Sequence, residues 1–109
     1  MANRWNISKA VEDFVEERDK NCAYCDSKFT DPKVSKKGMK TWEHVINDLN
    51  LTDKDNIVLS CMSCNSSKGA KHILDWLNSD YCKTNGINKN TVASVVKEVI
   101  IKEEKFIRH

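Results

Sequence analysis

The stretch TWEHVI places an acid, Glu43, directly beside a histidine, His44. Its apolar and aromatic neighbours favour a half-buried strand. A histidine there has an unperturbed pKa of about 6.5, which suits proton transfer at neutral pH. A single strand histidine is more often structural than catalytic, so the pair needs support from the rest of the chain before it indicates chemistry.

Four of the five cysteines form two C-x-x-C pairs. They are Cys22 and Cys25 in CAYC, and Cys61 and Cys64 in CMSC. Each pair can present two sulfurs to one ion, and two pairs complete a tetrahedral site. The odd count argues against a disulfide framework. The spacing therefore predicts a structural zinc, and we expect the fifth cysteine, Cys82, to be an ordinary thiol.

Length and charge limit the functions that the chain can have. Its 109 residues fit one domain with a thin core, which a metal would help to hold. The formal charge of +2 falls to about zero when four thiolates bind one zinc. Affinity for nucleic acid must then come from local clusters such as Lys36, Lys37 and Lys40, although a solvated loop is the alternative for these lysines.

No segment of the sequence indicates secretion or a membrane span. The N-terminal residues have no apolar core of a signal peptide, and no apolar run approaches the ~20 residues of a spanning helix. We therefore expect a soluble, cytoplasmic protein.

The order of the expected elements is helix, strand, strand, helix, linker and helix, which predicts an α+β fold. The helical pattern begins at Ile7, the strands are expected at 41–46 and 56–61, and a helix runs on from Cys64 towards 80. Residues 81–90 form a linker with an Asn-Gly turn signal. We divide the chain into a domain at 1–79 that carries the zinc site, and a linker with a C-terminal helix at 80–109.

The C-terminal segment from Thr91 to Ile107 has an apolar face made of Val92, Val95, Val96, Val99 and Ile100. Two interpretations stay open for this face. It packs on the core of its own chain, or it joins two chains in a homodimer.

Three stretches together resemble the HNH endonucleases, which are built on a small zinc-stapled ββα-metal finger with flanking helices. They are SKAVEDFVEERDKNCAYC, EHVI and NIVLSCMSCNSSKG. The resemblance extends from about Ile7 to Leu77. It implies a phosphodiester hydrolase that acts on nucleic acid, with double-stranded DNA as the expected substrate.

The resemblance also implies a role for each matching residue. His44 takes the place of the general base, and Asn56 takes that of the catalytic-set asparagine that holds the base in line. Glu43 and Asn65 take the places of the ligands of the catalytic metal, for which we expect Mg²⁺ or Mn²⁺. Lys68 takes the place of a lysine that we expect to contact phosphate.

Two departures and several alternatives accompany this interpretation. Glu43 stands where the family more often has Asp, and Asn47 stands where it usually has Pro. The competing function is a zinc-stapled DNA-binding module without catalysis, which would have no need of the set His44, Asn56 and Asn65. Restriction, phage and mobile-element nucleases all use this module, and the sequence leaves open which role applies.

Overall fold

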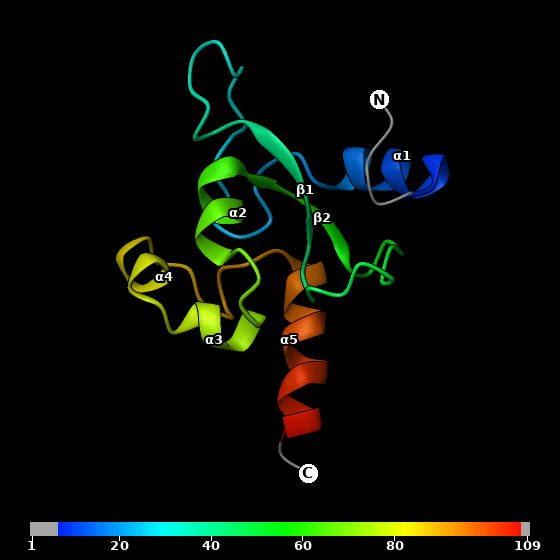
Figure 1. Cartoon of the computed structure of the whole chain (residues 1–109), viewed down its shortest axis with the longest axis vertical. Helices are drawn as coiled ribbons and strands as arrows, with labels where there is room; N and C mark the ends of the chain where they lie inside the picture. Colours follow the sequence, from blue (N-terminus) through cyan, green and yellow to red (C-terminus); the bar gives the residue numbers. More distant parts are fainter. Residues whose placement is uncertain (1–6, 108–109) are drawn as a thin grey trace.

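The computed structural model describes residues 7–107, in which five helices and two strands follow one another (Figure 1). The expected α+β class, with its ββα order and flanking helices, is confirmed. Residues 1–6 and 108–109 of the two expected domain segments lie outside the described range. The elements are α1 (Lys9–Arg18), β1 (Lys40–His44), β2 (Ile57–Cys61), α2 (Met62–Lys68), α3 (Ile73–Leu77), α4 (Asp80–Thr84) and α5 (Ser94–Ile107).

The two strands form an antiparallel pair that carries the rest of the fold. Lys40 pairs with Cys61 at one end and His44 with Ile57 at the other. All five residues of β2 are buried, so the sheet is covered on both faces. Ile57 and Leu59 pack with Val15 of α1 on one face. Val58 faces the larger cluster on the other side, as the alternation of strand side chains requires.

Helix α1 begins where the sequence offers a capping side chain. The Ser8 hydroxyl accepts a hydrogen bond from the Val11 N–H at 3.2 Å. This satisfies one of the amide groups that the first helical turn leaves without a partner.

The single long helix expected after Cys64 is wrong in one respect, because the helix is interrupted at Gly69. Helix α2 ends at Lys68, and Gly69 adopts a φ of 50°, a conformation that glycine tolerates best. Helix α3 then starts anew with His72 as its N-cap, whose ring accepts from the Leu74 N–H. The apolar period continued across this break, so period alone did not reveal it.

The linker expected at 81–90 is also wrong in part. Its first residues belong to helix α4, which Ser79 caps by accepting from the Cys82 N–H. The turn signal is real, since Gly86 has a φ of 67°. Ser79 and Asp80 at its start, together with the buried Cys82, allow one short helix before Gly86.

The apolar face of α5 packs within its own chain. Val92, Val96 and Ile100 are buried in the same cluster as Tyr24 and Trp76. Val95 and Val99 flank them and are half-buried. This face is therefore not available to join two chains in the conformation described.

A buried carboxylate ties α1 to β2. Asp19, which follows α1, is 7% exposed, and its Oδ2 accepts from the Leu59 N–H at 3.0 Å. The neighbouring Arg18 guanidinium donates to Asp19 and to the Ile57 carbonyl. These contacts join the end of α1 to strand β2, in addition to the apolar packing between them.

We expect Asp19→Ala to lower the free energy of unfolding by about 1–3 kcal/mol, because it leaves a buried N–H without its acceptor. Urea unfolding followed by circular dichroism measures this. Asp13→Ala is the matched control on the same helix: its carboxylate is exposed, so the change should stay within about 0.5 kcal/mol. Equal losses in both variants would contradict the role of Asp19.

Candidate functional site

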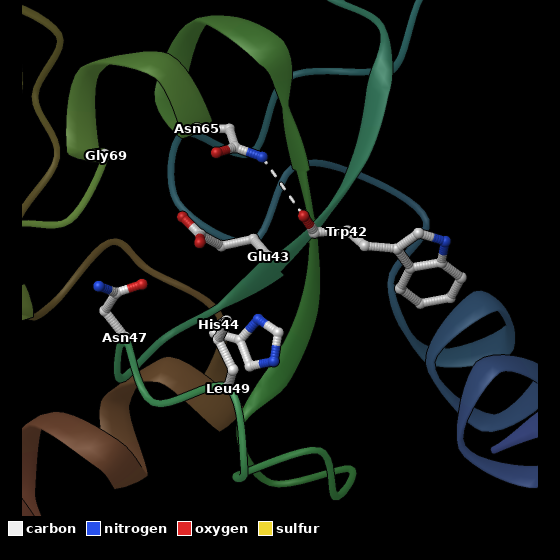
Figure 2. A pocket seen from close by; sticks show the side chains of 7 residues that line it. All are labelled: Trp42, Glu43, His44, Asn47, Leu49, Asn65 and Gly69. Carbon is white, nitrogen blue, oxygen red and sulfur yellow. Dashed lines mark hydrogen bonds between the residues drawn. The ribbon is translucent and has the colours of Figure 1, made fainter. Parts of the chain in front are cut away.

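A cavity of about 500 Å³ opens where β1, the loop after it and α2 meet (Figure 2). Its lining brings together three of the residues singled out in the sequence: Glu43, His44 and Asn65. The other lining residues are Trp42, Asn47, Leu49 and Gly69. Pairing with β2 positions β1. The chain passes directly from β2 into α2, and this places Asn65 opposite β1.

Glu43 and Asn65 present oxygen atoms to the same side of β1 (Figure 2). The Asn65 amide nitrogen donates to the Thr41 hydroxyl at 2.9 Å and to the Trp42 carbonyl at 3.3 Å. Since the nitrogen is engaged with the strand, the amide oxygen is left for a ligand. A carboxylate and an amide oxygen are donors that suit Mg²⁺ or Mn²⁺, so these residues fit a hard cation.

The Glu43 carboxylate is only 8% exposed although it lines the cavity. Burial raises its pKa to about 7, and the nearby Lys68 ammonium opposes the rise. A carboxylate with so little hydration gains much from a cation in the cavity. A cation in the cavity would therefore favour the ionised form of Glu43.

His44 is the last residue of β1 and lines the same cavity. Its ring leaves the strand on a different side from the Glu43 carboxylate, as successive strand residues do (Figure 2). Burial lowers its pKa below the usual 6.5, and the Lys68 charge lowers it further, while Asp48 acts in the opposite direction. The imidazole is thus neutral at pH 7 and able to accept a proton.

Asn56 braces the loop that follows the histidine. Its amide oxygen accepts from the Ile46 N–H at 2.8 Å, and its amide nitrogen donates to the carbonyls of Ile46 and Leu51. Because Asn56 is 5% exposed, these bonds form in a poorly hydrated place, where they hold firmly. They restrain the chain two residues after His44.

The four lysines expected to contact phosphate lie in different surroundings. Lys36 and Lys37 are exposed on the loop before β1. Lys40 is also exposed but forms an ion pair with Glu16 at 2.7 Å. Lys68 is 0% exposed, and its ammonium faces Glu43 and not the solvent. In this conformation the Lys68 ammonium is therefore not placed to contact a phosphate.

The sulfurs of Cys22, Cys25, Cys61 and Cys64 all lie within 4.8 Å of one another. They come from the turn after α1 and from the junction of β2 with α2. Mutual hydrogen bonds lower the pKa of Cys61 and raise that of Cys22, because the cluster stabilises one thiolate far better than several. Four sulfurs in this arrangement fit a structural metal such as zinc. Cys82 is buried elsewhere in the core and does not join them.

Three residues of the cavity wall were not predicted from the sequence: Trp42, Leu49 and Gly69. Leu49 is 58% exposed within a polar loop, and an apolar residue in such a loop was the available signal. His72 does not line the cavity, although it lies only seven residues after Asn65 in the sequence. It contacts Glu103 of α5 at 2.7 Å and caps α3.

Comparison with known proteins adds one finding to this geometry. Residues 22–71 match the family model described as HNH endonuclease. No curated protein and no solved structure matches the chain. Within residues 7–107, no helix has the length and apolarity that crossing a membrane would require.

We expect one zinc ion per chain, and we expect Cys61→Ser to lose it and to unfold or aggregate. A structural zinc contributes its binding free energy directly to folding, so the loss of a ligand removes both. Elemental analysis and circular dichroism of purified protein measure these outcomes. Cys82→Ala is the control: it removes a buried thiol outside the cluster and should keep the zinc. Well-folded wild-type protein without zinc would contradict the assignment.

Proposed function

We propose that the chain, whose residues 22–71 match the HNH endonuclease family model, is a metal-dependent endonuclease that hydrolyses phosphodiester bonds in DNA. One observation supports the proposal most: Glu43, His44 and Asn65 line a single cavity. A histidine and two oxygen donors at one place supply a proton acceptor and a cation site. A module that only binds DNA needs neither.

His44 would act as the general base. A neutral imidazole at the cavity wall can take the proton from a water molecule as that water attacks the phosphorus. Burial favours the neutral form, so the base stays in its active form down to a pH below 6.5. Asn56 would keep the ring in place through its bonds to the following loop.

Glu43 and Asn65 would hold the catalytic cation, for which we propose Mg²⁺ or Mn²⁺. Such an ion, when bound, stabilises negative charge on the phosphate and on the leaving oxygen. The geometry of Asn65 supports this role, since its amide nitrogen donates to β1 and its amide oxygen is left for a ligand.

Contact with the DNA backbone would come from the exposed lysines of the loop before β1. Lys36 and Lys37 are the best placed for this, while Lys40 would first have to leave Glu16. With so little net charge, such local contacts must supply the salt-dependent part of the affinity.

The cavity that Glu43, His44 and Asn65 line would act on one strand at a time. A double-strand break would require two chains. The homodimer thus remains a proposal, and it would need a surface other than the buried face of α5.

We expect His44→Ala to reduce DNA cleavage by about 10²–10⁴-fold, because it removes the proton acceptor. Relaxation of supercoiled plasmid in Mg²⁺ measures the rate, and fluorescence anisotropy should show DNA affinity within about twofold of wild type. His72→Ala is the matched control, since this histidine lies outside the cavity. A His44→Ala variant that cuts at the wild-type rate would refute the assignment. DNA binding without cleavage by the wild type would favour the non-catalytic module.

We also expect the zinc-loaded chain to cleave with Mg²⁺ or Mn²⁺ and not with additional Zn²⁺ or Ni²⁺ alone. The donors at the site are oxygens, which prefer the harder ions. Parallel plasmid assays after removal of loosely bound metal distinguish these cases, with Asn65→Ala expected to lower the apparent affinity for Mg²⁺. Cleavage supported only by the softer ions would point to a nitrogen ligand at the site.

A further inference from the structure

Lys68 is the most deeply buried cation in the described part of the chain. Its side chain is 0% exposed, and its ammonium donates to the His44 carbonyl at 3.2 Å. The same ammonium lies 3.8 Å from Oε2 of Glu43. Burying a charge is costly unless an opposite charge and hydrogen bonds compensate for it. The position of Lys68 is therefore coupled to that of Glu43.

Tyr24 approaches the same carboxylate from the zinc-binding turn. It stands between Cys22 and Cys25, is 0% exposed, and its ring packs edge-on against Trp76 with 4.9 Å between centroids. Its hydroxyl and Oε2 of Glu43 are both buried and make no hydrogen bond of standard geometry in the structure. Burial raises the pKa of the Tyr24 phenol, and the Glu43 charge raises it further, so the hydroxyl keeps its proton and can donate it in a hydrogen bond.

The Lys68 ion pair lies on the inner side of the Glu43 carboxylate. Oε2 is the buried oxygen, while the side chain as a whole lines the cavity. Figure 2 shows the carboxylate on the cavity side together with the Asn65 oxygen. If Oε2 is held inward, Oε1 is the oxygen left to meet a cation.

We propose that Lys68 and Tyr24 are positioning residues that hold Oε2 of Glu43 and thereby direct Oε1 into the cavity as a single-oxygen ligand. This inference rests on the proposed function, since it concerns the same cation site. It gives Lys68 a role on the inner side of the metal ligand in place of contact with phosphate. It also links the turn that carries two of the zinc-binding cysteines to the catalytic acid.

The effect of Lys68 on the cation distinguishes positioning from simple repulsion. A buried ammonium repels a second cation nearby, so its removal would tighten cation binding if repulsion were its main effect. If the ammonium mainly holds the carboxylate in place, its removal lets the carboxylate turn away, and cation binding weakens. The sign of the change in affinity therefore decides between the two.

The test measures Mn²⁺ binding to the full-length, zinc-loaded chain by electron paramagnetic resonance, without nucleic acid. Lys68→Met keeps an unbranched side chain, shorter by the one terminal nitrogen, and removes its charge. We expect it to weaken Mn²⁺ binding by about 10–100-fold, as the loss of outer partners of metal ligands does. Lys71→Met is the matched control, since this lysine is exposed and bonds only to the Ser67 carbonyl. It should leave Mn²⁺ affinity unchanged.

Tyr24→Phe provides a second variant in case Lys68→Met does not fold. It removes one hydroxyl and keeps the ring against Trp76, so zinc content and thermal unfolding should stay close to wild type. We expect Mn²⁺ binding to weaken by about 10-fold. In plasmid cleavage, we expect a higher half-saturating Mn²⁺ concentration at an unchanged KM for DNA. A purely structural role of the hydroxyl would not move Mn²⁺ affinity in protein with intact zinc and fold.

Unchanged or tighter Mn²⁺ binding in folded Tyr24→Phe or Lys68→Met would overturn the inference. A wild-type chain that binds no Mn²⁺ would overturn it as well. The proposed function fails differently: a wild type that binds Mn²⁺, with the expected losses in both variants, but cleaves no nucleic acid would contradict the nuclease and support the positioning.

Discussion

The meeting of four cysteine sulfurs is the constraint on which the rest of the structure depends. It joins the turn after α1 to the junction of β2 with α2, two places far apart in the chain. The same junction sets the start of α2 and so the position of Asn65 opposite β1. In a chain of this size, apolar burial alone gives a small margin of stability, and a metal held by four sulfurs adds to it directly.

The candidate site lowers the stability of the fold, in contrast to the cysteine cluster. It buries Glu43, His44 and Lys68 together, which costs free energy that a core of apolar residues would not. Burial raises the pKa of the acid and lowers that of the histidine, and both shifts have desolvation as their main cause. Each shift alters the protonation state of a group in a way that a cation and an attacking water could use.

The two centres are connected through the packing between them. Tyr24 lies between the two cysteines of the first pair, and its ring contacts Trp76. The Trp76 indole donates to the hydroxyl of Ser67, the residue before Lys68. Val92, just before helix α5, and Val96 and Ile100 within it close this cluster. The C-terminal helix therefore supports the core beneath the site from within the same chain.

Much of this arrangement could be predicted from the sequence, because it depends on local patterns. The cysteine spacing, the strand around Glu43 and His44, and the order of strand, strand and helix are set by neighbours a few residues apart. The family resemblance rested on the same short stretches, and the match over residues 22–71 confirms it. The end of α2 at Gly69 was harder, since the apolar period continues across a glycine even where the backbone turns. Helix α4 was missed because its five residues are too few to show a helical period.

The tertiary structure alone decided how the ionisable groups are used. The lysine of the Asn-x-x-Lys-Gly stretch is expected to be exposed, because a charged side chain is normally hydrated. Lys68 instead points inward to the carboxylate of Glu43, 25 residues earlier in the chain. Likewise, the face of α5 had two possible partners, and only the packing showed that its own core covers it. Residue types and spacing determine which chemistry is available at Glu43, His44 and the cysteines. Burial and the choice of partner depend on contacts between distant segments, and no local pattern encodes those.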